Sequence, residues 1–194
     1  MSVQKITQKL SQNQIGIIPH DTIPGIIARM SEENANRIID IKKRDQTKGF
    51  IILIPSTDHL SQLVTDIPSH AKKLITKFWP GPLTIIFNKQ PSIPTIISGF
   101  ETTIAIRYPK HPLLNQLLTE LNEPLITTSA NISTETNLSK ELITAVDFCD
   151  DSIHQAESIK STQASTIINC TTTTPTIIRH GTINQKKLTN NLIQ

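Results

Sequence analysis

Short apolar runs of four to seven residues recur along the chain, bounded by glycine, proline or polar residues. Runs of this length with these boundaries predict buried or half-buried β-strands. The clearest begins at Gly49 and ends at Pro55. By this pattern, strands are predicted at 15–19, 49–55, 83–87, 103–108, 125–129, 165–170 and 176–179.

The segments between these runs carry apolar residues three and four positions apart, which is the period of an amphipathic helix. One such segment begins at Ser31, a suitable N-cap, and Glu32 and Glu33 favour the positive end of the helix dipole. Helices are predicted at 31–44, 57–64, 69–78 and 111–121, with a further helix beginning at Ser139 and a polar helix or tail at the C-terminus.

Alternating strands and helices predict an α/β or α+β fold in which helices flank an open sheet. The composition agrees, since 33 Ile, 25 Thr and 3 Val are β-branched residues that suit strands, although a biased genome gives the same excess. The 194 residues show no internal repeat and no domain linker, so we expect a single domain over 1–194.

Hydropathy and cysteine content exclude membrane-spanning, secreted and disulfide-rich proteins, and the net charge bears on possible partners. No stretch approaches the roughly 20 apolar residues of a membrane span, and the N-terminus lacks the apolar core of a signal peptide. We therefore expect a cytoplasmic protein without a membrane contact. Cys149 and Cys170 are too few for a disulfide framework or a four-cysteine zinc site, and no metal site is expected. A net charge of +3 permits a polyanionic partner without requiring one.

The sequence has no P-loop, no G-x-G-x-x-G and no G-x-S-x-G motif, but three other groups of polar residues could carry chemistry. Lys42, Arg44 and Lys48 lie at a predicted helix end and in the next loop, where they either complement the helix dipole or converge on a triphosphate. Residues 127–131 (Thr-Thr-Ser-Ala-Asn) form an ordinary turn or line a ligand crevice at a strand end.

The third group is a pair of arginines within predicted strands, Arg107 and Arg179. A guanidinium buried in a sheet needs an internal ion pair or an anionic ligand. Together with the basic loop and the hydroxyl-rich strand end, these arginines predict a cavity for an anionic small molecule. Trp79 is expected in the core rather than as a stacking platform.

Read together, the segments resemble the YrdC-like threonylcarbamoyl-AMP synthase family in its short, single-domain form. The resemblance runs in order from Ile15 to Gly181, and its combination of motifs is far more specific than any one of them. The matching segments are 19–25 (PHDTIPG), Lys42-x-Arg44 with Lys48-Gly49, 78–84 (FWPGPLT), 105–112 (AIRYPKHP), 129–131 (SAN), 165–168 (STII) and Ile178-Arg179-x-Gly181.

The resemblance implies an open, twisted mixed sheet flanked by helices around a positively charged cavity. It also implies a nucleotidyltransferase that joins L-threonine, bicarbonate or CO2, and ATP into L-threonylcarbamoyladenylate and pyrophosphate, with Mg2+ accompanying the ATP. Proteins of the TsaB, TsaD and TsaE type would then transfer the threonylcarbamoyl group to adenosine 37 of tRNAs that read ANN codons. The cavity also leaves room for a contact with tRNA or another RNA.

Residue roles carry over from the same resemblance. Lys42 and Arg44 would be catalytic, and Arg44 and Lys48 would hold the ATP phosphates. The residues facing the amino acid would be Thr22, Arg107, Ser129 and Ser165, and those touching ATP would also include Thr103, Asn131 and Arg179.

The first motif departs from the family pattern, with His20-Asp21 where a Thr-Glu pair is usual and Pro24 where an aromatic residue is usual. Asp45 also follows Arg44 in place of the usual proline. These departures concern substrate recognition more than the fold. Two alternatives stay open: an RNA-binding protein of the same fold without synthase activity, and a relative that uses carbamoyl phosphate.

Overall fold

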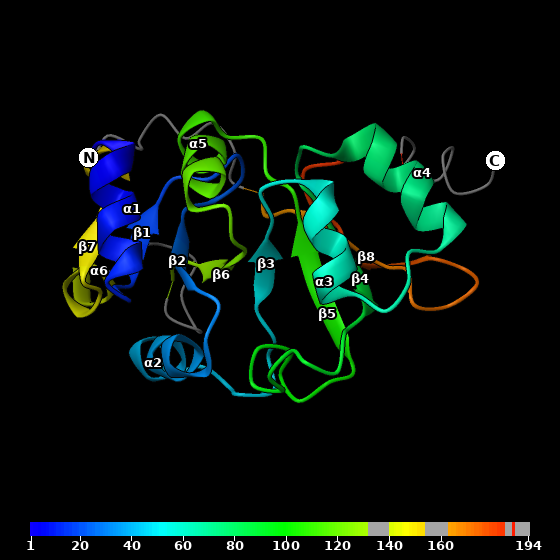
Figure 1. The fold of residues 1–194 in the computed structure, drawn as a ribbon, viewed down its shortest axis with the longest axis horizontal. Helices are drawn as coiled ribbons and strands as arrows, with labels where there is room; N and C mark the ends of the chain where they lie inside the picture. The colour runs from blue at the N-terminus through cyan, green and yellow to red at the C-terminus, as the bar shows by residue number, and fades with distance from the viewer. Residues whose placement is uncertain (132–139, 154–162, 185–187, 189–194) are drawn as a thin grey trace.

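The computed structural model describes residues 1–131, 140–153, 163–184 and 188, and Figure 1 shows how their helices and strands are arranged. The helices are α1 (Val3–Ser11), α2 (Glu32–Lys42), α3 (Leu60–Leu63), α4 (Ser69–Phe78), α5 (Pro112–Leu121) and α6 (Lys140–Ala145), with the 3-10 helices η1 (Thr57–His59) and η2 (Asp151–Ile153). The strands are β1 (Gly16–Ile18), β2 (Gly25–Arg29), β3 (Ile51–Leu53), β4 (Leu83–Asn88), β5 (Thr103–Arg107), β6 (Leu125–Ser129), β7 (Phe148–Cys149), β8 (Thr166–Asn169) and β9 (Thr176–Arg179).

Every predicted strand overlaps an observed strand, and α2, α4 and α5 confirm three of the predicted helices. Helix α2 ends at Lys42, two residues before its predicted end, because Lys43 adopts a left-handed conformation with φ of 48°. The predicted helix 57–64 is divided into η1 and α3. The helix start predicted at Ser139 and most of the predicted C-terminal helix or tail lie outside the described residues. The pattern does not predict α1, β2 or β7.

The strands form one mixed sheet in the order β7-β1-β2-β6-β3-β5-β4-β8-β9. The pairs β1–β7, β3–β5 and β4–β8 are parallel, and the other neighbouring pairs are antiparallel. The sheet is open and flanked by helices, as the alternation of strands and helices predicts (Figure 1). Strands distant in sequence are therefore neighbours, and β8 reaches β4 from the far end of the chain.

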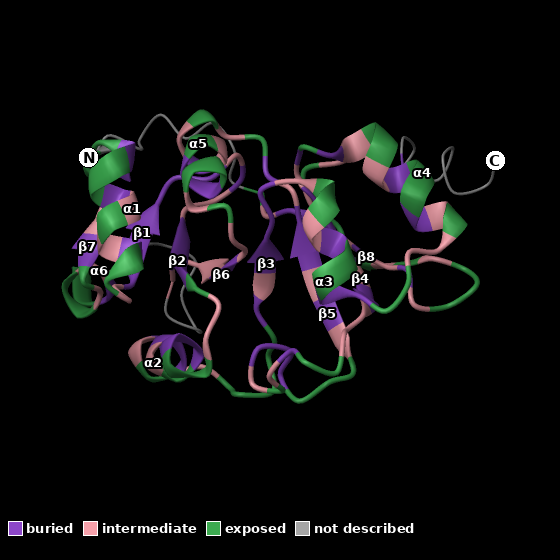
Figure 2. Ribbon diagram, viewed as in Figure 1, coloured by how far each residue is buried: buried purple, intermediate pink, exposed green. Residues whose placement is uncertain are grey.

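Alternating side chains divide the sheet into two faces, and Figure 2 shows that its strands are mostly buried while the outer sides of α1 and α4 are exposed. Ala28, Ile52 and Ile106 lie level on one face and belong to the larger apolar cluster, which includes residues of α2, α3 and α4. On the other face, Ile27 and Leu53 pack with α1 and α5 in a second cluster. The core therefore has a helical layer on each side of the sheet.

Two smaller predictions concern side chains in this core. Trp79 is buried, and its indole N–H donates a hydrogen bond to the Leu83 carbonyl at 2.7 Å, which confirms it as a core residue. Cys149 and Cys170 are free, as two reduced cysteines would be. Among the residues that the structure describes, no helix combines the length and the apolar character needed to cross a bilayer.

Candidate active site

A cavity of about 220 Å³ opens between the β1–β2 loop, the loop after α2, and strands β5, β6, β8 and β9. Strand register explains the grouping, because Thr127, Ile51 and Ala105 lie level on neighbouring strands and all line this cavity. The described lining contains no aspartate or glutamate. The predicted site residues that line the cavity are Thr22, Arg44, Arg107, Ser129, Ser165 and Arg179.

Arg44 lines the cavity and is fixed there by contacts with neutral groups. Its Nη1 donates to Thr128 Oγ1 at 2.9 Å, and its Nη2 donates to the Lys48 carbonyl at 2.6 Å. The guanidinium also lies 4.8 Å from the centre of the Phe50 ring. Among the described residues, no carboxylate forms an ion pair with Arg44. A rigid cation of this kind is suited to binding phosphate.

Lys42 lies behind the cavity wall rather than in it. Its side chain is buried, with 3% of the residue exposed, and its Nζ donates to the Ser129 carbonyl and to Asn131 Oδ1, the latter at 3.2 Å. Ser129 Oγ donates to the same Asn131 oxygen at 2.5 Å. Burial, followed by the charges of Arg44 and Lys48, lowers the pKa of Lys42 to about 8. Lys42 therefore anchors the turn that carries Ser129 and Asn131.

The side chains of Lys48, Thr103 and Asn131 do not belong to the cavity lining. Lys48 is exposed and contributes its carbonyl oxygen to Arg44. Thr103 begins β5, on the same face as the cavity-lining Ala105 and Arg107, but beyond the cavity's end. Their roles toward ATP stay predictions.

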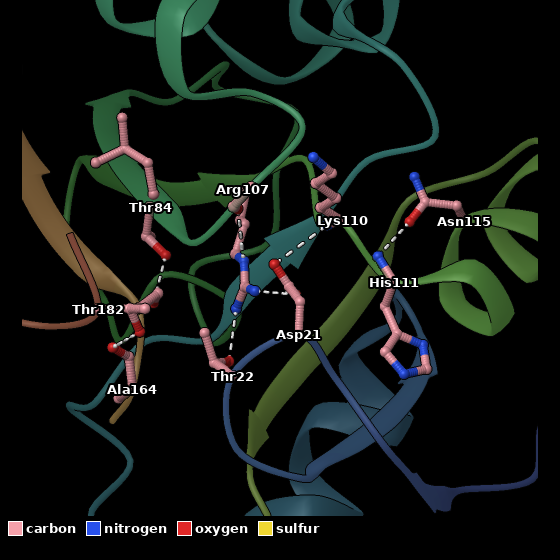
Figure 3. A network of polar contacts seen from close by, with 12 residues as sticks. Asp21, Thr22, Thr84, Arg107, Lys110, His111, Asn115, Ala164 and Thr182 are labelled. Atoms are coloured by element: carbon pink, nitrogen blue, oxygen red, sulfur yellow. Dashed lines mark hydrogen bonds and ion pairs between the residues drawn. The ribbon is translucent and has the colours of Figure 1, made fainter. Parts of the chain in front are cut away.

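Arg107 also lines the cavity, and it belongs to an internal polar network that Figure 3 shows. Its guanidinium donates to Asp21 Oδ1, to Thr22 Oγ1 at 3.0 Å and to the Gly81 carbonyl at 3.2 Å. The Lys110 N–H donates to the second Asp21 oxygen at 3.2 Å. Burial lowers the pKa of Arg107, and the Asp21 charge opposes that effect.

Arg107 therefore forms an internal ion pair with Asp21, which is one of the two alternatives that the sequence left open for this arginine. A guanidinium has five N–H groups, and the three contacts leave donors for a ligand on the cavity side. Because Asp21 already balances its charge, Arg107 is suited to orienting a carboxylate more than to attracting one.

Arg179 and Ser165 form a third polar group at the β8–β9 side. Arg179 donates from Nε to the Ser165 carbonyl and from Nη2 to Ser165 Oγ, both at 3.0 Å. Ser165 Oγ also lies 2.8 Å from Thr84 Oγ1 of β4. The exposed Arg179 is thus held over a buried serine that links two strands.

His20 is a titratable residue of the cavity lining that sequence reasoning did not select as functional. Only 6% of the residue is exposed, and its ring packs so closely on β2 that a Cβ at Gly25 would lie 2.6 Å from Cε1 and Nε2. Burial, with smaller contributions from Arg107 and His111, lowers the pKa of His20 to about 3. The imidazole is therefore neutral at physiological pH. The one sequence feature that could have pointed to His20 is the departure from the family motif at His20-Asp21.

The low pKa of His20 predicts acid sensitivity. Between about pH 6.5 and pH 3 the unfolded chain binds a proton at His20 that the folded protein does not, so stability is full above pH 6.5 and falls as the pH is lowered. We expect a loss of about 1 kcal/mol per pH unit from this group. Urea unfolding at pH 7 and at pH 5 measures how much unfolding free energy is lost between the two pH values. This loss should be about 2 kcal/mol smaller for His20→Leu than for the wild type. Equal differences would contradict the neutral, buried imidazole.

The chemistry of the described residues favours anions over metal ions. Among them, no group of three or more His, Cys, Asp or Glu is placed to hold a metal. Three guanidiniums and several hydroxyls surround the cavity instead. Such donors match phosphate and carboxylate oxygens.

Comparisons with known proteins point to one family. A model of Sua5, YciO and YrdC proteins, described as "Telomere recombination", matches residues 8–181. Threonylcarbamoyl-AMP synthase of Pyrococcus abyssi is 31% identical over 175 residues, which cover 89% of this chain and 52% of that protein. The enzyme of the same name from Hahella chejuensis is 33% identical over 133 residues, which cover 68% of this chain and 72% of that protein.

The fold gives the same answer. The crystal structure of P. abyssi Sua5 complexed with L-threonine matches with a TM-score of 0.87 at 25% identity, over 98% of this chain and 57% of that one. This chain spans about half the length of the P. abyssi protein. With a family model matched across most of its residues, the chain belongs to the Sua5/YciO/YrdC family.

Proposed function

We propose that this protein is a threonylcarbamoyl-AMP synthase, a nucleotidyltransferase that makes L-threonylcarbamoyladenylate and pyrophosphate from L-threonine, bicarbonate or CO2, and ATP. The observation that carries the proposal is the cavity that brings Arg44, Arg107 and Arg179 together without a lining carboxylate. The reaction requires two anions, a carbamate and a triphosphate, to approach each other. Fixed cations lower the electrostatic free energy needed to bring the two anions together.

In the proposed reaction, threonine is first carboxylated on its amino nitrogen, and a carbamate oxygen then attacks the α-phosphorus of ATP. The new O–P bond forms as the bond from the α-phosphorus to the β-phosphate oxygen breaks, and the electron pair of that bond leaves with pyrophosphate. Arg44 would hold the phosphates, because its charge has no ion-pair partner among the described residues. Arg179 would assist from the β9 side.

Arg107 and its neighbours would bind the amino acid. Its remaining N–H groups would orient the threonine carboxylate, with Thr22 and Ser165 beside it. Ser129 would lie between the two substrates on the turn anchored by Lys42. The carbamate is itself the nucleophile, so the proposal assigns no protein general base.

Mg2+ would enter with ATP as part of the substrate. A protein-held Mg2+ site needs carboxylate ligands, and the polar groups of the described lining are hydroxyl, backbone amide, guanidinium and imidazole groups, with no carboxylate. The ion would therefore take its ligands from phosphate oxygens and water.

The same proposal places the protein in the cytoplasm, as a single domain over 1–194 that supplies its product to tRNA-modifying proteins of the TsaB, TsaD and TsaE type. A contact with tRNA is part of the proposal, since the arginines of the cavity lining would also suit RNA phosphates.

The test is pyrophosphate release from ATP and bicarbonate, with and without L-threonine, and with the other amino acids in parallel. We expect release that depends on threonine. Release that depends on a different amino acid would change the proposed substrate. No release from folded protein that binds ATP would contradict the synthase proposal, and salt-sensitive RNA binding in that protein would favour the RNA-binding alternative.

A further inference from the structure

His20 presents a buried polar atom that the protein itself does not satisfy. Its Nε2 has no hydrogen-bond partner in the structure, although the residue is 94% buried and lines the cavity. A buried donor or acceptor without a partner costs about 1–3 kcal/mol, and most such groups in folded proteins are paired. An atom of this kind at a cavity wall is suited to pairing with a ligand.

The surroundings of the ring leave the cavity as the source of that partner. The imidazole packs against Gly25 of β2, and Thr127 Oγ1 of β6 lies beside the same point. The Thr127 hydroxyl proton is already donated to the Ile26 carbonyl at 2.8 Å. Two residues along the chain, the Thr22 hydroxyl accepts a hydrogen bond from Arg107. His20 therefore lies close to the residues proposed to bind the amino acid, and neither threonine hydroxyl forms a hydrogen bond with its Nε2.

The charge of the ring indicates what kind of group it would take. Burial keeps the pKa of His20 far below physiological pH, so the imidazole is neutral, whereas carboxylates and phosphates are better matched by the three guanidiniums. A neutral imidazole nitrogen is a donor in one tautomer and an acceptor in the other. A hydroxyl group can pair with either form, since it both donates and accepts. A carboxylate only accepts hydrogen bonds, so it can pair only with the tautomer that donates from Nε2.

We propose that His20 is a specificity-determining residue, whose Nε2 hydrogen-bonds the side-chain hydroxyl of the amino-acid substrate. This inference rests on the proposed function and adds to it the group that reads the side chain. Valine has nearly the shape of threonine but no hydroxyl, so it would leave Nε2 buried and unpaired. Sites built to pair with a substrate hydroxyl reject such isosteres strongly.

The experiment compares threonine with valine in the wild type, His20→Leu and His20→Thr. For each protein, kcat/KM for pyrophosphate release is measured with both amino acids. We expect the wild type to prefer threonine, and His20→Leu to lower the threonine-to-valine ratio by about tenfold to a hundredfold, mainly by losing threonine activity. His20→Thr restores a hydroxyl, as in the family motif, and should retain part of the preference. His59→Gln, a histidine outside the cavity, should leave the ratio unchanged.

A second measurement needs neither turnover nor a variant. In wild-type protein with histidine labelled by 15N, threonine should shift the Nε2 resonance of His20, and valine should not. Calorimetric titration with each amino acid gives the binding preference directly.

The outcomes separate the two proposals. The role of His20 would be overturned if turnover depends on threonine but the threonine-to-valine ratio is unchanged in folded His20→Leu, or if threonine does not shift the Nε2 resonance. Either result would leave the synthase proposal intact. Selective threonine binding and a shifted resonance without turnover would support His20 and contradict the synthase. Binding of neither amino acid would overturn both.

Discussion

Replacement of Arg107 by methionine should lower the free energy of unfolding by about 3 kcal/mol, since it leaves the largely buried Asp21 carboxylate without its ion-pair partner. The side chains of Arg107 and Asp21 are only 4% and 11% exposed, so water compensates little of the loss. The contacts to Thr22 and Gly81 would be lost as well. Urea unfolding of the purified protein measures the effect.

A double-mutant cycle attributes this loss to the pair. Asp21→Asn removes the charge that Arg107 balances, so the double variant should be less destabilised than the sum of the single variants. Strict additivity would show that the two charges do not interact. The matched control is Arg29→Met, because Arg29 pairs with Glu123 with side chains 44% and 29% exposed. An exposed pair should contribute no more than about 1 kcal/mol.

Replacement of Arg44 by glutamine should weaken ATP binding by about tenfold to a hundredfold, which corresponds to one lost charge-assisted hydrogen bond. The variant should keep most of its stability, since glutamine can still donate to Thr128 or to a loop carbonyl, and no buried carboxylate loses a partner. Calorimetric titration with ATP measures the affinity.

Lys43→Gln is the matched control for Arg44. It removes one positive charge from the adjacent position, but Lys43 is exposed and lies outside the cavity lining. Its effect on ATP affinity should stay below about twofold, because exposed charges are well screened. Equal losses in the two variants would indicate a general field of positive charge and contradict a specific phosphate contact by Arg44.

Local patterns predicted most of the elements, because strands and helices here bury faces with clear periods. Helix α5 is an example, with Leu114, Leu117 and Leu118 buried at spacings of three and four. The pattern does not predict β2 because its five residues begin at Gly25, inside the motif 19–25, and end at the exposed Arg29. Helix α1 has a mostly polar sequence, and only Val3, Ile6 and Leu10 are buried.

The site depended on tertiary pairing that no local pattern contains. The motifs selected Arg107 as a cavity residue, but nothing in the sequence placed Asp21 beside it. Lys42 read as a phosphate ligand because it is two residues from Arg44, whereas the end of α2 directs it behind the turn at Ser129. The burial of His20 follows from its packing on Gly25, which only the fold reveals.

The departures from the family motif have physical explanations in the structure. Pro24 lacks a backbone N–H, and the contact at this position uses its carbonyl oxygen, which accepts from the Ala130 N–H at 2.9 Å. Asp45 accepts from the Thr47 N–H at 2.9 Å, so its carboxylate is engaged by its own loop. Asp21 forms the ion pair with Arg107.

The pairing of β8 with β4 and β9 also has a consequence for biosynthesis. The cavity lining begins at His20 but includes Ser165 and Arg179, so it draws on a segment that is synthesised long after the β1–β2 loop. In a nascent chain, β1, β2, β6, β3, β5 and β4 can pair with one another before β8 is made. The cavity lining would become complete only after β8 and β9 have joined β4. A ligand bound in the cavity would therefore favour chains that include β8 and β9 over shorter ones, because a ligand stabilises only the state that can bind it.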